Sequence, residues 1–469
     1  MKKTARKMIG LLAIIAMLTC SMAMAESADT LNIDWDARYT YAELEAQLKA
    51  IDENYSGISE LYPIGYSRQE RNLWCIKLTS DGIPDENKTG IAVFANIHGG
   101  ERESASSAMY FAWWLATESE TEEVKKILDN YIIYVIPVIN PDGYEQSFVY
   151  NTRQNLRPRD LNGNNIPFSD PYTDIDGDGF IATLYRGVAD QQPDRRAVSS
   201  FGMESPDWDK NGVLGDDPRN SGIDMNRSFD YQWNRYDIDT VETGVIGANA
   251  WRSAGPESAS EPEIQAVQNF LYNTEIDALA TLHTGIQCVL YPWCYRPYDE
   301  AIDSDDILYM KDTAAKMAAA YQETTGRGFY TMPSYEDYPT AAELIDFAYG
   351  RLNIHSYTIE VYNGGKSEDG NILECKWENE LPEEKWVFYA QEQLAEMGLD
   401  LATLVDANGE GLAEGEGLWF YTNATAEMVN KAPAEQSLMV EGCRDSLLVM
   451  IESEPYGAGY TKPMYLNWK

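Results

Sequence analysis

Basic residues are few in this chain. Its 469 residues include 36 Lys and Arg against 76 Asp and Glu, which gives a formal net charge of −40. An acidic surface of this kind repels phosphate-rich polymers and anionic lipid surfaces, so the composition excludes nucleic acid as a partner. The charge gives no general reason to expect acidic substrates.

Long apolar runs are also few. One follows the basic N-terminal MKKTARK and ends at the A-x-A pattern of Ala23–Ala25, which predicts a secretory signal peptide over residues 1–25. Cys20 follows Thr19, which is not the small residue preferred before a lipid-anchored cysteine, so we expect cleavage after Ala25. Cleavage would remove four basic residues and no acids and shift the net charge from −40 to −44. No other run is long enough to span a bilayer, so we expect a secreted protein, extracellular or in a bacterial cell envelope.

Cysteine is scarce as well. The chain has six, and five remain after the predicted signal peptide. An odd number at irregular spacing provides no disulfide framework. Cys288 and Cys294 are the one pair that the spacing allows, and buried free thiols are the alternative that we favour.

The pattern of apolar residues predicts strands that alternate with helices. Hydrophobic residues make up 44% of the chain, enough for a large core. Strand patterns cover residues 91–97, 131–139, 278–283 and 354–361, and helical patterns cover 39–55, 104–117, 261–273, 305–323 and 382–397. This alternation favours an α/β fold with a doubly wound or mixed sheet. Residues 399–469 change in composition, and we expect them to form a small C-terminal appendage of β type.

An insertion rich in Asp, Asn and Gly interrupts the alternation at residues 160–217. Two of its segments place oxygen-bearing side chains at the first, third and fifth positions of a loop, with Gly at the sixth, as calcium loops do. Neither segment has Glu at the twelfth position, and a polar loop without an ion is the alternative. The candidate calcium ligands are Asp174, Asp176, Asp178, Asp207, Asp209, Asn211 and Asp216.

Two of only three histidines end predicted strands. His98 follows an apolar run and precedes Gly-Gly and Glu101, and His283 ends the run ALATLH. Strands of one open α/β sheet end at the same edge, so these side chains can form a two-histidine, one-carboxylate zinc site. HxxE by itself is equally compatible with a solvated turn. His355 lies five residues before Glu360 on one predicted strand, so it points to the opposite face and is interpreted as structural.

Five motifs stand in the order typical of one enzyme family. They are HGGE at 98–101, NPDGY at 140–144, DMNRSFD at 224–230, TLHTG with LYPW at 281–293, and TIEVY at 358–362. Over roughly residues 39–397 the sequence resembles the zinc metallocarboxypeptidases of the carboxypeptidase A and T type. The resemblance implies a mixed, mostly parallel sheet with helices on both faces, spanning residues 26–398.

The resemblance also implies roles for individual residues. His98, Glu101 and His283 match the ligands of one zinc ion, and Asp224 matches the carboxylate that orients the first histidine. Glu360 matches the general base.

The remaining matches concern the substrate. Arg153 matches the arginine that stabilises the oxyanion, although Arg157 and Arg159 are close by. Asn226 and Arg227 match the pair that holds the C-terminal carboxylate, and Tyr338 matches the mobile tyrosine that covers it. At the specificity position Ile345 predicts an apolar floor, whereas Glu343 nearby would instead admit Lys or Arg.

The sequence therefore predicts a secreted, monomeric zinc carboxypeptidase that removes C-terminal amino acids from peptides and proteins. One alternative is a hydrolase of γ-glutamyl-diamino acid links in peptidoglycan stem peptides, for which Glu343 is the one suggestive residue. An acyl-amino-acid amidohydrolase of the desuccinylase type shares the ligand set, but DMNRSFD and Tyr338 argue against it. A catalytically inactive binding module is the last alternative, and the presence of every ligand and of Glu360 argues against it.

Overall fold

The computed structural model describes ten segments of the chain. They are residues 31–150, 152–194, 197–198, 200–218, 222–233, 235, 254–362, 385–406, 408–422 and 435–455. The predicted signal peptide lies outside them. Among the described residues no helix is both long and apolar enough to cross a membrane.

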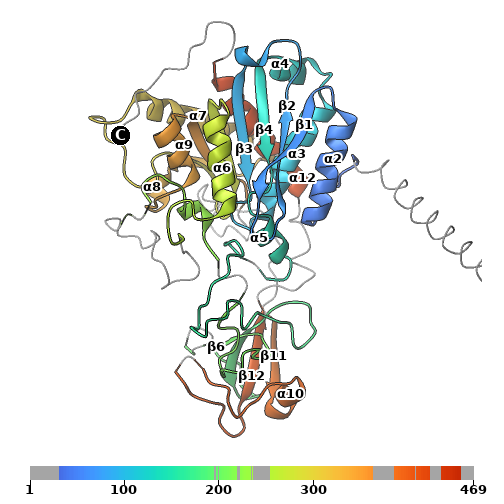
Figure 1. The fold of residues 1–469 in the computed structure, drawn as a ribbon, viewed down its shortest axis with the longest axis vertical. Helices are drawn as coiled ribbons and strands as arrows, with labels where there is room; N and C mark the ends of the chain where they lie inside the picture. The colour runs from blue at the N-terminus through green and yellow to red at the C-terminus, as the bar shows by residue number, and fades with distance from the viewer. Residues whose placement is uncertain are drawn as a thin grey trace, which may run out of the picture.

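The larger part of the molecule is built on an eight-stranded sheet with the order β1-β2-β4-β3-β7-β10-β8-β9 (Figure 1). Its strands are β1 (Ser59–Tyr66), β2 (Asn72–Leu78), β3 (Thr89–Ala95), β4 (Tyr131–Ile136), β7 (Ala278–His283), β8 (Cys288–Tyr291), β9 (Tyr330–Pro333) and β10 (His355–Glu360). The pairs β3–β4, β3–β7, β7–β10 and β8–β9 are parallel, and the others are antiparallel. This mixed, mostly parallel sheet is the one that the resemblance implies.

The central strands are apolar because both of their faces are covered. Every residue of β3 and β4 is buried, as expected for strands between two layers of helices. One face carries α2 (Tyr41–Asn54), α3 (Arg102–Thr117), α4 (Glu122–Asn130), α7 (Asp305–Thr325) and α12 (Gln436–Ser453). The other carries α6 (Pro262–Asn273) and α9 (Leu344–Leu352). The short helices α5 (Pro141–Gln146) and α8 (Ser334–Asp337) follow β4 and β9.

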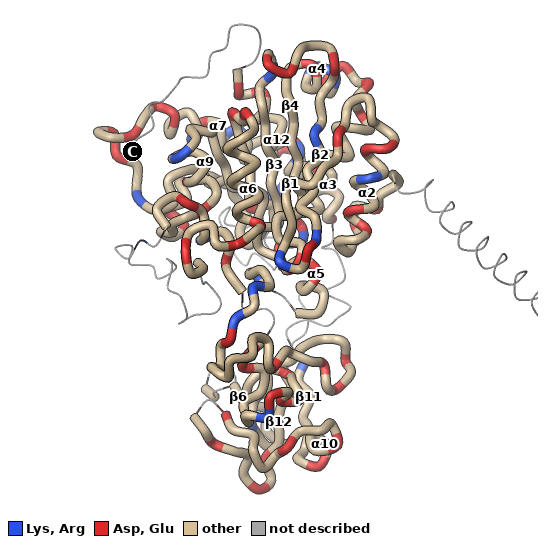
Figure 2. The backbone as a smooth tube through the Cα atoms, viewed as in Figure 1, with Lys and Arg blue, Asp and Glu red and all other residues tan. Residues whose placement is uncertain are grey.

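A second, antiparallel sheet forms a small lobe from residues 160–218 and 385–422. Its order is β11-β12-β5-β6, with β5 (Thr183–Gly187), β6 (Ser200–Met203), β11 (Lys385–Ala390) and β12 (Gly417–Thr422), and α10 (Gln391–Glu396) lies beside it. The lobe has its own core, which includes Leu184, Phe201, Leu394 and Phe420. The lobe lies below the large sheet in Figure 1. Figure 2 shows acidic residues over both parts of the molecule.

The structure contradicts one of the predicted helices and joins two distant segments of the chain. The predicted helix over 382–397 is instead strand β11 followed by the short α10, and β11 pairs with β12, which pairs with β5 of the insertion. The insertion and the segment after residue 384 therefore form one unit, because a two-stranded hairpin alone is marginally stable. The predicted β appendage over 399–469 contributes β12, but its apolar run at Leu447–Ile451 belongs to helix α12, which packs into the main core.

The four described cysteines are buried and free. Cys288 and Cys294 do not form the disulfide that the spacing allowed, and Cys75 and Cys443 are also unpaired thiols. Cys20 and Cys375 lie outside the described residues. The alternative of buried free thiols holds for the part of the chain that is described.

If α12 is part of the main core, Leu447→Ala should lower the free energy of unfolding by about 2–5 kcal/mol, because the side chain is fully buried. Leu308→Ala is the matched control, since this leucine lies on α7 with 43% of its surface exposed, and it should change stability by about 0.5 kcal/mol. Denaturant unfolding of both variants measures the difference. Equal, small losses would contradict the packing of α12 described above.

Candidate metal centre and substrate cleft

The carboxyl ends of β3 and β7 bring the candidate metal ligands together. The two strands are adjacent and parallel, with Ala95 opposite Leu282. His283 is the last residue of β7, while His98 and Glu101 lie in the turn between β3 and α3. Gly99 is required in this turn because a Cβ there would lie 2.3 Å from the backbone carbon of Gly143.

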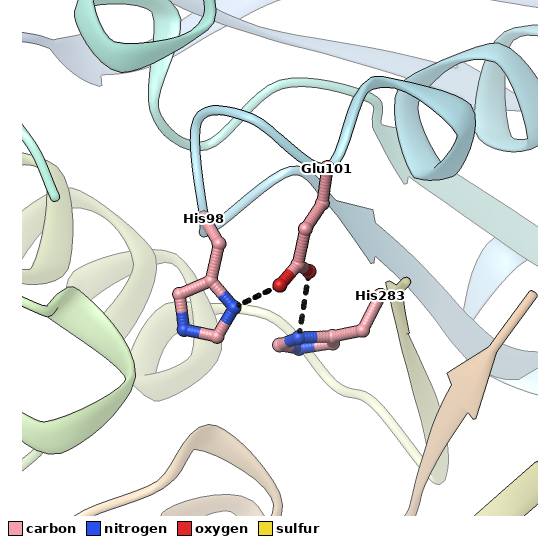
Figure 3. A group of neighbouring side chains, drawn as sticks. All are labelled: His98, Glu101 and His283. Carbon is pink, nitrogen blue, oxygen red and sulfur yellow. Dashed lines mark hydrogen bonds and ion pairs between the residues drawn. The ribbon is translucent and has the colours of Figure 1, made fainter. Parts of the chain in front are cut away.

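The ligand atoms converge on one point, as Figure 3 shows. His98 Nδ1 lies 2.8 Å from Glu101 Oε1, and His283 Nδ1 lies 3.2 Å from Glu101 Oε2. One nitrogen from each ring and one carboxylate oxygen all lie within 4.8 Å of one another. Two imidazoles and one carboxylate form the donor set of a catalytic zinc site, in which the fourth position stays open. The residues present therefore fit a zinc ion.

Asp224 fixes the orientation of the first histidine. Its Oδ1 lies 3.2 Å from His98 Nε2, so that Nε2 donates to the carboxylate and Nδ1 remains available as a ligand. Its Oδ2 accepts a hydrogen bond of 2.6 Å from Arg153 Nε. Although burial opposes ionisation, Arg153 and His98 hold the pKa of Asp224 well below its usual range, so the side chain stays anionic. Thr281 Oγ1 lies 3.2 Å from Nε2 of His283 in the corresponding position.

Glu360 lies beside the metal ligands without a partner of its own. It ends β10, directly opposite His283 on the neighbouring parallel strand. Its Oε2 is buried and accepts no hydrogen bond from any described residue. Burial raises the pKa of Glu360 to about 8; His283 opposes this, and Glu101 adds to it. A buried carboxylate with a pKa near neutrality is suited to take up and release a proton.

These residues line one cavity of about 250 Å³. Arg227 and Tyr338 also line it, and their Nη2 and Oη are 3.1 Å apart. Asn226 also lines it, and its Oδ1 accepts a hydrogen bond from the backbone of Leu344 at 3.0 Å. Sequence reasoning missed the other lining residues, which are Thr284, Gly285, Ile286, Leu290, Ser334, Asp337 and Thr358. Of these residues, Asp337 could have been predicted from the sequence, because it directly precedes Tyr338.

The predicted apolar floor at Ile345 is corrected by the structure. Ile345 is the second residue of α9, and its side chain is buried outside the lining of the cavity. Glu343, which directly precedes the same helix, lines the cavity instead. The sequence pattern could not separate the two because the position of the first helical turn decides which side chain faces the cleft.

His355 lies away from the cavity, as expected from its strand position. Its Nδ1 is 2.8 Å from Glu454 Oε1, and its ring packs on Tyr309. The contact joins the start of β10 to the end of α12, which fits the structural role that we expected for this residue.

The candidate calcium loops gather only in part. Carboxylate oxygens of Asp174, Asp176 and Glu204 lie within 4.8 Å of one another, while Asp178 forms an ion pair with Lys385. Glu204 was missed because it lies far along the chain. In the second loop Asp207 accepts hydrogen bonds from the backbone of Asn211 and Gly212. The side chains of Asp209 and Asp216 are joined by amide groups, including that of Asn211.

Comparison with known proteins identifies the class of the molecule. A family model described as zinc carboxypeptidase matches residues 44–386. Carboxypeptidase B of Astacus astacus is 24% identical over 338 residues, which cover 71% of this chain and 89% of that protein. Carboxypeptidase M of Mus musculus is 34% identical over 139 residues, which cover 28% of this chain and only 31% of that protein.

Solved structures share the fold. The crystal structure of carboxypeptidase A from Helicoverpa armigera has a TM-score of 0.55 at 14% identity, over 92% of this chain and 78% of that chain. Thrombin activatable fibrinolysis inhibitor has a TM-score of 0.52 at 15% identity, over 89% of this chain and 78% of that chain. The fold and the His-Glu-His group are thus those of a zinc metallocarboxypeptidase, a hydrolase. Since the family model spans well over half of the chain, the protein belongs to the zinc carboxypeptidase family, and the resemblance seen in the sequence is confirmed.

The role of Asp224 can be tested on metal binding alone. Asp224→Asn should weaken zinc binding by about 10–100-fold, because the amide cannot hold His98 and Arg153 as an anion does. Asp230→Asn is the control, since this nearby carboxylate is 51% exposed and lies 3.6 Å from Arg351. Competition with a chromogenic chelator measures both affinities. Equal zinc affinities in the two variants would contradict the role assigned to Asp224.

Proposed function

We propose that this protein is a secreted zinc carboxypeptidase that hydrolyses the last peptide bond of peptides and proteins. The observation that carries the proposal is the arrangement of one cavity. The His98, Glu101 and His283 group and the unpaired Glu360 line it, and Arg227 and Tyr338 line the same cavity. An enzyme that cleaves at the C-terminus needs a group that binds the terminal carboxylate close to the centre where the peptide bond is hydrolysed.

Arg227 and Asn226 are suited to hold the C-terminal carboxylate. Arg227 is 1% exposed and presents a guanidinium fork, which matches a carboxylate in shape and charge. The side-chain oxygen of Asn226 is occupied by the backbone N–H of Leu344, so its amide NH₂ is the group left to donate. The hydroxyl of Tyr338 lies beside Arg227 and would contact the same carboxylate.

The remaining groups of the cavity act on the peptide bond that is hydrolysed. When bound, zinc supplies a Lewis acid that polarises a carbonyl and makes water a stronger nucleophile. Glu360 takes a proton from the attacking water at its free Oε2 and passes it to the leaving amine. Arg153, oriented through its Nε by Asp224, stabilises the negative charge that develops on the carbonyl oxygen.

Export and a monomeric state are part of the same proposal. The supporting feature for export is the sequence pattern of residues 1–25. The expectation of a monomer stays a prediction.

The proposal is tested by digestion of a defined peptide pool with the purified mature protein, followed by mass spectrometry. We expect ladders that shorten one residue at a time from the C-terminus. A zinc chelator should abolish them, and Glu360→Gln should reduce kcat by at least about 10²–10⁴-fold because the base is lost. The variant should keep its zinc, which separates loss of the base from loss of the metal.

Two other outcomes point to the alternatives. Cleavage of peptidoglycan stem peptides while ordinary C-termini stay intact would favour the γ-glutamyl-diamino acid hydrolase. Failure to cut either substrate by protein that holds zinc would favour an inactive binding module.

Calcium in the insertion is a further proposal, supported by the loop spacing and by the grouping of Asp174, Asp176 and Glu204. Titration of calcium into chelator-treated protein should release heat and raise Tm, because an ion bound to the folded state stabilises it. Magnesium serves as the control, since it fits such flexible oxygen sites poorly. If calcium changes neither quantity, the loops are polar turns without an ion.

A further inference from the structure

The cavity beyond the metal centre holds more negative charge than a pocket for apolar side chains would need. Besides Glu101 and Glu360, its lining includes Asp337 and Glu343. Among the described residues of that lining, Ile286 and Leu290 are the only aliphatic side chains larger than Ala. Burying an apolar group against two carboxylates would desolvate them without any compensating contact.

Glu343 occupies the place that an apolar floor was expected to fill. Only 7% of it is exposed, and its Oε1 lies 2.8 Å from Arg227 Nη1 and 2.6 Å from Thr340 Oγ1. Among the described residues, the one donor near its Oε2 is the weak thiol of Cys294, at 3.5 Å. Oε1 of Glu343 is therefore bound by Arg227 and Thr340, whereas Oε2 can still accept a hydrogen bond from a strong donor.

Asp337 lines the same cavity and has no ion-pair partner among the described residues. It follows Glu336 at the end of α8, is exposed, and forms no hydrogen bond or ion pair with any residue in the described segments. It precedes Tyr338, which contacts Arg227, so it lies beside the proposed anchor for the chain end.

The pairing of Arg227 with Glu343 adds a constraint on the substrate. A C-terminal carboxylate bound at Arg227 lies close to Glu343, and two anions would then share one guanidinium. A cationic side chain on the same residue restores the balance, because it can bind the free oxygen of Glu343 and the carboxylate of Asp337.

From these contacts we infer that Asp337 and Glu343 select substrates whose C-terminal residue is basic, with Glu343 as the main determinant. The inference rests on the proposed carboxypeptidase function and names its substrate class. The group that is recognised is an ammonium or guanidinium at the end of a long side chain, as in Lys or Arg.

The test uses four peptides that differ only in the last residue, which is Lys, Arg, Leu or Phe. The wild-type protein should cleave the basic pair with a kcat/KM at least about tenfold above the apolar pair. Glu343→Gln should lower kcat/KM for Lys and Arg by about 10–100-fold more than it lowers kcat/KM for Leu and Phe, so that the ratio of basic to apolar substrates falls. Asp337→Asn should lower the basic pair by about 3–10-fold.

Controls separate selectivity from folding and from net charge. Glu336→Gln removes the same charge next to Asp337 from an exposed residue outside the cavity, and it should leave the ratio of basic to apolar substrates unchanged. Zinc content and thermal melting report on the fold of Glu343→Gln, because Glu343 is paired with Arg227. Asp337 has no partner to lose, so its variant remains informative even if the other is unstable.

A binding measurement distinguishes failure of this inference from failure of the proposed function. Nα-acetyl-lysine should bind the zinc-loaded protein at least about tenfold more tightly than Nα-acetyl-norleucine, and Glu343→Gln should remove that difference. If no peptide is cut but this binding preference is seen, the proposed activity fails and the acidic selectivity site stands. Equal binding of the two ligands, a wild-type preference for Leu or Phe, or a basic preference unchanged in both variants would overturn the inference.

Discussion

The parallel pairing of β3, β7 and β10 is the constraint on which the candidate site depends. Three parallel neighbours end at one edge of the sheet, and this edge receives His98 and Glu101 after β3, His283 at the end of β7 and Glu360 at the end of β10. No single segment contains this set. The hydrogen-bonded register decides that His283 and Glu360 stand directly opposite each other, and a shift of one residue would turn one of the two side chains to the other face.

Most of the acidic side chains around the cleft have a cation beside them. Asp224 contacts His98 and Arg153, and Arg227 contacts Glu343. Unpaired charges would be costly at these depths, so the pairs hold each other in place and position the groups that face the cavity. Glu360 and Asp337 are the exceptions among the lining acids. Their lack of partners is the physical reason why we propose the first for proton transfer and the second for substrate recognition.

The small lobe is attached to the rim of this cleft. Its first connection leaves the main domain after Arg153 and one connection returns just before Asp224, and the two are joined where Asn155 and Ile223 exchange hydrogen bonds. Arg157 anchors the outgoing segment to Glu261 at the base of α6. Since β11 and β12 come from beyond residue 384, strands β7, β8, β9 and β10 of the large sheet lie in sequence between the two halves of the lobe. The pairing of β12 with β5 therefore depends on contacts between residues that are distant in the sequence.

The sequence by itself determined the local elements and the chemistry of the site. Apolar runs marked the buried strands, the spacing of His98 and Glu101 marked a turn that can hold a metal, and the ordered motifs implied partners for each. It could not determine which distant strands pair, because hydrogen bonds between β11, β12 and β5 leave no trace in local periodicity. It also could not determine whether Ile345 or Glu343 lines the cavity. That depends on where α9 begins and on the ion pair between Glu343 and Arg227. Those choices are made by contacts between residues that are distant in the sequence, and only the tertiary structure contains them.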